Sequence, residues 1–185
     1  MKSPEWDLSN VAAAACVFLA AGAALALALA LSAAPARATD EPDEFAAGKV
    51  VVIKSSGRLA KFVAKPRRGG AFDLPNTPAN DPITHGGMLH IFDTVNPRND
   101  NTYNLPAGLG WKGLGKPEGS KGFKYKGAKT LADPCAVLLR RSLVKAVCKG
   151  RAVTLAPPFD GNVGIVLTVG TGSKRYCASF GGSTA

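Results

Sequence analysis

The sequence predicts an all-β protein, and three observations carry that prediction. Short runs rich in Val, Ile, Leu and Phe recur from Lys49 onward, and Gly, Pro, Asn and Ser separate them. Beyond the N-terminal apolar run, no segment has the 3.6-residue periodicity of an amphipathic helix. Residues 135–148 have the symmetric apolar pattern of a β-hairpin. We therefore expect a single antiparallel β-sandwich of roughly ten short strands, after an N-terminal signal helix.

The N-terminal segment has the features of an export signal. Lys2 precedes a charge-free run over residues 11–31 that is mostly Ala and Leu, and Ala36-Arg37-Ala38 follows it. A charged start, an apolar middle and a small-x-small end are typical of a secretory signal peptide, cleaved here after Ala38. The same run is long enough to cross a bilayer core of roughly 30 Å. Residues 1–38 are thus predicted to be a signal peptide or, if uncut, a membrane anchor.

The chain beyond Ala38 has 147 residues, a length that suits one domain with a proper core. Residues 39–47 begin with a run of acidic residues and are predicted to be a disordered linker, and residues 48–182 are predicted to be the β-sandwich. This part of the chain holds 21 basic and 11 acidic residues, so its net charge is +10. After export, that charge favours an anionic polysaccharide or the cell envelope as partner. No specific nucleic-acid motif is present.

Alternation and turn residues place the individual strands. The run 74–87 holds three prolines and two glycines and is predicted to be a loop. Strands are predicted at residues 49–54, 59–64, 88–93, 102–105, 123–127, 135–140, 143–148, 152–156, 162–170 and 175–180.

The strands 135–140 and 143–148 form the clearest unit. If Arg141 and Ser142 make the turn, one face of the hairpin is wholly apolar and consists of Cys135, Val137, Leu139, Val144, Ala146 and Cys148. In that register Cys135 lies opposite Cys148, within the Cα separation that a disulfide bridges. We expect a Cys135–Cys148 disulfide and a free thiol at Cys177. That thiol is either a small buried apolar group or a reactive or intermolecularly bridged one.

Residues 111–128 form the one candidate binding surface in the sequence. Aromatic faces stack on sugar rings or bases, and ammonium groups attract anions. Trp111 is the only tryptophan after Ala38, and glycines flank it. The candidate binding residues are Trp111, Phe123, Tyr125, Lys112, Lys124 and Lys126. The alternative is that Trp111 fills the core and the lysines are merely solvated.

No residue pattern points to catalysis, a metal or a cofactor. Two histidines and two aspartates cluster locally, but without the spacing of a zinc site: His85, His90, Asp81 and Asp93. Asp100 between two asparagines is predicted to be a solvated turn rather than a calcium ligand. The other carboxylates are scattered, and their spacing does not indicate a catalytic pair. An enzyme is therefore not expected, and the alternative is a small secreted hydrolase using His85, His90 and Cys177.

Residues 49–182 contain several distinctive short motifs. They are Asp81-Pro82, Gly86-Gly87, LPAGLGWKGLG from Leu105, GSKGFKYKG from Gly119, and the runs DPC, KAVCKG and YCASFGG. In these motifs the chain resembles a Gly/Lys-rich β domain found in secreted proteins of environmental bacteria. The resemblance implies a small exported β module with a binding or structural role at the cell surface, and it transfers no catalytic residue. The second hypothesis is a purely architectural protein without a ligand.

Overall fold

The computed structural model describes residues 41–67, 70–171 and 174–181. Ten strands and two short helical turns lie in these ranges: β1 (Glu44–Lys54), β2 (Leu59–Pro66), η1 (Pro78–Asn80), α2 (Pro82–His85), β3 (Gly87–Asp93), β4 (Asp100–Leu105), β5 (Trp111–Leu114), β6 (Gly122–Lys126), β7 (Cys135–Arg140), β8 (Leu143–Lys149), β9 (Val163–Val169) and β10 (Lys174–Phe180). The predicted all-β class is confirmed. The predicted signal segment, residues 1–38, lies outside the described residues.

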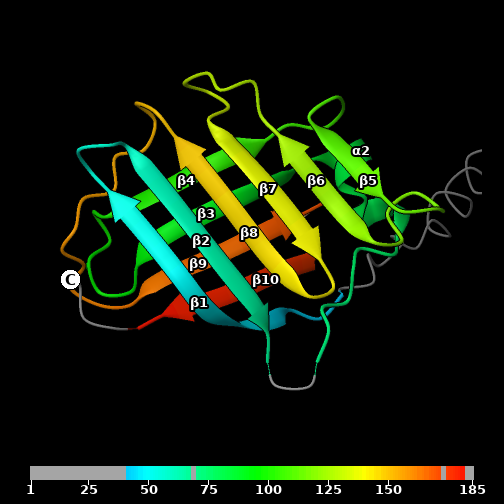
Figure 1. The fold of residues 1–185 in the computed structure, drawn as a ribbon, viewed down its shortest axis with the longest axis horizontal. Helices are drawn as coiled ribbons and strands as arrows, with labels where there is room; N and C mark the ends of the chain where they lie inside the picture. The colour runs from blue at the N-terminus through cyan, green and yellow to red at the C-terminus, as the bar shows by residue number, and fades with distance from the viewer. Residues whose placement is uncertain (1–40, 68–69, 172–173, 182–185) are drawn as a thin grey trace, which may run out of the picture. The chain divides into compact units, whose positions relative to one another are not determined.

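The strands form one continuous sheet that curls over on itself, in the order β4-β3-β9-β10-β1-β2-β8-β7-β6-β5. Figure 1 shows the layer of β1, β2, β8, β7, β6 and β5 in front, and β4, β3, β9 and β10 crossing behind it. The β1–β10 pair is parallel, so the prediction of a wholly antiparallel sandwich is wrong at this pair. β1 serves both layers, because residues 44–47 pair with β10 and residues 46–54 pair with β2. The register with β2 is irregular between Gly48 and Val50.

The predicted acidic linker is in part a strand. Glu44 to Ala47 belong to β1, and the carboxylates of Asp43 and Glu44 are paired with cations of β10. Asp43 accepts two hydrogen bonds from Arg175, at 2.7 and 2.8 Å, and Glu44 accepts one from Lys174 at 2.9 Å. Because these charges are neutralised locally, the segment 43–47 is bound to the sheet instead of forming a linker.

The core lies between the two layers and follows the period-2 alternation of the strands. On β3, Leu89, Ile91 and Asp93 point inward, and Met88 lies on the outer side. The largest fully buried apolar side chains come from both layers and from the connecting segments: Phe62, Phe72, Leu89, Ile91, Leu105, Tyr125, Leu139, Leu155, Ile165 and Leu167. No helix in the described ranges is both long and apolar enough to cross a membrane.

The predicted strand at residues 152–156 is wrong, although Val153 and Leu155 are buried as a strand would bury them. Val153 N donates to the carbonyl oxygen of Gly150, and the backbone groups of Thr154 and Ala156 bond to side chains instead of to another strand. Asn101 accepts from Thr154 N at 3.0 Å, and Asn99 both accepts from Ala156 N and donates to its carbonyl oxygen. The polar run around Asp100 therefore holds this segment in place through hydrogen bonds. It is not the solvated turn that the sequence suggested.

Candidate functional site

The predicted disulfide is present at the end of the β7–β8 hairpin. Cys135 lies opposite Cys148 in the predicted register, and both residues are buried. The two strands leave only Arg141 and Ser142 for the turn. A disulfide is consistent with an oxidising environment.

Replacing either bridged cysteine with serine is expected to lower the free energy of unfolding by about 2–3 kcal/mol, because the bridge closes a short loop. The two cysteines are 13 residues apart. Urea unfolding of Cys135→Ser and Cys148→Ser measures the loss, with Cys177→Ser as the control of smaller effect. An equal loss in the control, together with alkylation of Cys135 or Cys148 in the native protein, would refute the pairing.

The three aromatic residues predicted to bind ligand lie in the core, so the prediction of an aromatic binding surface is wrong. Trp111, Phe123 and Tyr125 are 4%, 6% and 1% exposed. The Trp111 ring lies 5.0 Å from that of Tyr125, and its Nε1 donates to Leu105 O at 3.3 Å. Burial raises the pKa of Tyr125, as does its hydrogen bond to Asp133. The burial of these aromatic residues follows from the WKG and FKYK patterns. Because side chains alternate along a strand, the aromatics point inward and the lysines point outward.

The fluorescence of Trp111 tests this burial. If cleavage removes Trp6, Trp111 is the sole tryptophan of the mature chain. We expect the blue-shifted emission of an indole in an apolar site and poor quenching by iodide in the native protein, with both reversed in denaturant. A red-shifted emission that iodide quenches freely in the native state would place Trp111 on the surface.

The lysines between these aromatics belong to a much larger cationic surface. We call it the basic face: the outward-pointing side chains of β2, β5, β6, β7, β8 and residues 50–54 of β1. The ribbons of these strands make up the front layer in Figure 1. Its cations are Lys54, Lys61, Lys65, Lys112, Lys124, Lys126, Arg140, Lys145 and Lys149. Of the nine, only Lys61 and Lys145 are partly buried. Strands β2, β5, β6, β7 and β8 contain no Asp or Glu at all.

The charges on the basic face stand close together without compensation. Lys112 is directly opposite Lys124 across the β5–β6 pair, and Leu138 separates Lys124 from Lys145 in the same cross-strand row. None of the nine cations forms an ion pair with a described residue. Like charges directly opposite each other destabilise a sheet by a few tenths of a kcal/mol. This arrangement therefore costs stability in the absence of an anionic partner.

The outer side of the other layer has a different character. On β3, the ring of His90 stacks on that of Phe92, with centroids 4.6 Å apart, and His90 Nε2 is 2.6 Å from a carboxylate oxygen of Asp100. On β10, Arg175 is paired with Asp43. His90 and Arg175 on this side thus each have a carboxylate partner, in contrast to the cations of the basic face.

The histidines and aspartates that cluster in sequence do not form a site. His85 is exposed at the end of α2, whereas His90 lies on β3. Asp81 caps α2 by accepting from Ile83 N at 3.0 Å, and Asp93 accepts from four backbone N–H groups. Among the described residues, no group of three or more His, Cys, Asp or Glu side chains could hold a metal ion.

The hydrogen bonds of Asp93 predict an acid-sensitive fold. Burial raises the pKa of this carboxyl, but the four N–H donors lower it by more, so that it lies below the ordinary value of 3.8. Because the folded-state pKa is depressed, the stabilisation is present above pH 3.8 and is lost as the pH falls through the folded-state pKa. Asp93→Asn is expected to be less stable at neutral pH and to lose less stability on acidification. Unfolding curves between neutral and acid pH measure both effects, and parallel curves for the two proteins would contradict the assignment.

Cys177 lies on β10, half-buried and not bridged. Burial raises the pKa of its thiol, and the nearby charge of Asp43 raises it further, although Arg175 opposes the shift. A raised pKa leaves little thiolate, so this cysteine has the properties of a structural residue rather than of a nucleophile.

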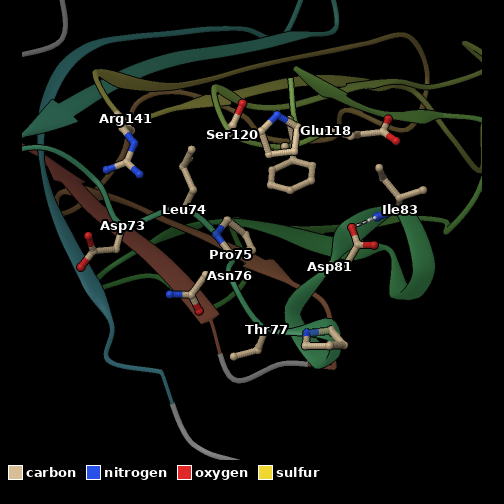
Figure 2. Close-up of a pocket in the computed structure, with 14 residues that line it drawn as sticks. Asp73, Leu74, Pro75, Asn76, Thr77, Asp81, Ile83, Glu118, Ser120 and Arg141 are labelled. Atoms are coloured by element: carbon tan, nitrogen blue, oxygen red, sulfur yellow. Dashed lines mark hydrogen bonds between the residues drawn. The ribbon is translucent and has the colours of Figure 1, made fainter. Parts of the chain in front are cut away.

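A pocket of about 510 Å³ opens at one end of the sheet (Figure 2). One wall comes from the β2–β3 connection, residues 73–83, and the other from the β5–β6 loop, residues 117–120, together with Arg141 of the β7–β8 turn. This pocket could not be predicted from local sequence patterns, because three connections that are distant in sequence build it. Phe123 is the one predicted binding residue that lines it.

Comparison with family models, with curated proteins and with solved structures found no match.

Proposed function

We propose that this protein is an exported, noncatalytic β module that binds an anionic polysaccharide or another anionic polymer of the cell envelope. The single observation that carries the proposal is the basic face. It gathers nine cations on adjacent strands without one carboxylate in β2 or β5 to β8. Such a concentration of one sign of charge attracts polyanions over the Debye length, about 10 Å at 0.1 M salt.

The spacing of the basic face suits an extended polymer. Neighbouring strands lie about 4.8 Å apart, so the outward lysines of β5, β6 and β8 form a row that crosses the sheet. The aliphatic residues Leu138, Val147 and Val63 lie next to lysines of the basic face and are partly buried. Long lysine side chains can cover such residues with their methylene groups and hold their ammonium groups in water. A polyanion would therefore contact several charges at once.

Export is supported from two sides. The N-terminal segment has the pattern of a signal peptide, and the Cys135–Cys148 bridge is consistent with an oxidising compartment. The resemblance to β domains of secreted bacterial proteins is in agreement with both. If residues 1–38 stay uncut, the same domain would be held at the membrane.

A purely architectural role is the second candidate, and the burial of Trp111 favours it. With Trp111, Phe123 and Tyr125 in the core, no exposed aromatic ring remains on β5 or β6 to stack on a sugar. In that case the lysines serve solubility alone. The two candidates differ in one observable, which is whether an anionic polymer binds.

A hydrolase that uses Cys177 is less well supported. Its thiol has a raised pKa, and His90, the histidine on the same side of the sheet, is separated from Cys177 by Val166 of the intervening strand β9. Native-state alkylation of Cys177 at neutral pH is expected to be slow.

Binding of polygalacturonate and of neutral dextran to the purified protein, measured over a salt series, tests the proposed function. We expect polygalacturonate to bind at low salt and to be released as salt rises, because the contacts are ionic. Dextran, which carries no charge, controls for general adhesion to polysaccharide. If polygalacturonate binds at no salt concentration, the proposed function is contradicted and the architectural role is favoured.

A further inference from the structure

The pocket at the end of the sheet has mixed chemistry. Its polar lining includes the carboxylates of Asp73 and Glu118, the guanidinium group of Arg141 and the amide of Asn76. Prolines form much of the remaining wall: Pro75, Pro78 and Pro117. A volume of about 510 Å³ falls within the range of small-molecule sites.

Several of these polar groups are available to a ligand. The side chains of Asp73, Asn76 and Arg141 form no hydrogen bond with another described residue. Glu118 uses only Oε1, which accepts from Gly113 N at 3.3 Å. Figure 2 shows Arg141, Ser120 and Glu118 on one side of the pocket, with Asp73, Asn76 and Asp81 on the other. A ligand between the walls would thus meet both donors and acceptors.

The backbone around the pocket is anchored to the sheet. Phe72 N donates to the carbonyl oxygen of Arg141 at 2.8 Å, which joins the two walls at one end. Tyr176 Oη donates to the carbonyl oxygen of Asp73 at 2.6 Å. Asp81 is held in place because its Oδ1 accepts from Ile83 N and its Oδ2 from Thr84 Oγ1. The backbone that carries the pocket side chains, and the Asp81 carboxylate, are consequently positioned by the fold before a ligand arrives.

We propose that this pocket binds one sugar unit of a glycan through its hydroxyl groups. A hydroxyl group both donates and accepts hydrogen bonds, so it can pair with the carboxylates as well as with Arg141 and Asn76. A small anion would meet Asp73, Asp81 and Glu118, and an apolar ligand would remove the charged groups from water without pairing them. The prolines offer apolar surface to the C–H groups of the ring.

The pocket adjoins the basic face at the β7–β8 turn, and in this respect the inference rests on the proposed function. Arg140 is the last residue of β7 and points outward on the basic face, whereas its neighbour Arg141 lines the pocket. A polysaccharide that lies along the basic face could therefore place a unit in the pocket at the end of the sheet. The basic face would hold the charges of the polymer, and the pocket would recognise a sugar.

Neutral oligosaccharides separate the pocket from the basic face. The probes are cellohexaose, chitohexaose, laminarihexaose and mannohexaose, each titrated to about 10 mM into the isotopically labelled protein at about 1 M salt, where the Debye length is only about 3 Å. We expect at least one probe to shift the backbone amide resonances of Thr77, Ile83 and Ser120 in a saturable way. Failure of all four probes to shift these resonances overturns the inference.

Two exposed arginines provide matched variants. Arg141→Ala is expected to weaken binding of the neutral probe at least about tenfold. Arg151→Ala removes the same charge outside both the pocket and the basic face and is expected to leave binding unchanged. Asn76→Ala is a second pocket variant, for use if Arg141→Ala does not fold. Unchanged binding in a folded pocket variant overturns the inference. Because the probes are uncharged, this result is independent of whether polygalacturonate binds the basic face.

Discussion

Replacing Lys174 with methionine is expected to lower the free energy of unfolding by about 3–5 kcal/mol. Lys174 is 1% exposed, and its Nζ lies 2.9 Å from Glu44 Oε1, 3.2 Å from Pro42 O and 3.8 Å from Glu41 Oε2. Methionine has a similar length but no charge, so both carboxylates would lose their partner in a largely buried site. The loss is large because an unpaired buried charge costs more than the pair contributes.

Urea unfolding measures this loss, and two further variants locate its cause. Lys149→Met removes an exposed lysine of the basic face and is expected to change the free energy of unfolding by less than about 0.5 kcal/mol. Adding Glu41→Gln and Glu44→Gln to Lys174→Met should recover part of the stability, because the unpaired charges are then gone. A loss of under about 1 kcal/mol in Lys174→Met would show that segment 41–44 contributes little to holding the fold together.

Lys112→Glu is expected to stabilise the fold and, at the same time, to weaken binding of polygalacturonate. Lys112 is directly opposite Lys124, and a glutamate there would replace repulsion by attraction, worth about 0.2–1 kcal/mol in the free energy of unfolding. On the basic face the same change removes one cation and adds an anion, so we expect affinity at low salt to fall by about tenfold.

Two lysines serve as controls for Lys112→Glu. Lys126→Glu makes the same charge change on the basic face, but the residue opposite it on β7 is Ala136, so binding should weaken with no comparable gain in stability. Lys116→Glu makes that change in the β5–β6 loop and should affect binding least. Urea unfolding and the binding titration are run on all three variants. If Lys112→Glu is stabilised but binds as the wild type does, the proximity of Lys112 to Lys124 has no role in binding.

Local pattern was sufficient to predict much of the fold. The hairpin register followed from the apolar face that ends in Cys135 and Cys148, because a slip of one residue would have mixed that face. The segment 152–156 was misassigned since its alternation is that of a strand. Only the distant side chains of Asn99 and Asn101 reveal where its hydrogen bonds go. Segment 43–47 was misassigned because its acidic composition resembles a linker, whereas Lys174 and Arg175 neutralise it.

The candidate site was harder to predict, for a physical reason. The alternation of Lys112, Lys124 and Lys126 with aromatics already indicated that the lysines point outward and the aromatics inward. However, β2 joins β8 across a long sequence separation, and the basic face exists only after that pairing. The pocket likewise needs three connections to meet. Long-range assembly of this kind leaves no local pattern in the sequence.

The most direct test of the central claim is the salt dependence of polygalacturonate binding for a triple variant of the basic face, Lys112→Gln, Lys124→Gln and Lys126→Gln. The matched control carries Lys116→Gln, Lys121→Gln and Lys129→Gln, which remove the same charge from the loops beside β6. We predict that the first variant binds at least about tenfold more weakly at low salt, with a shallower dependence on salt, and that the control stays close to the wild type. Equal binding by the two variants would contradict the account. It would show that binding depends on the net charge of the protein and not on the position of the lysines on the basic face.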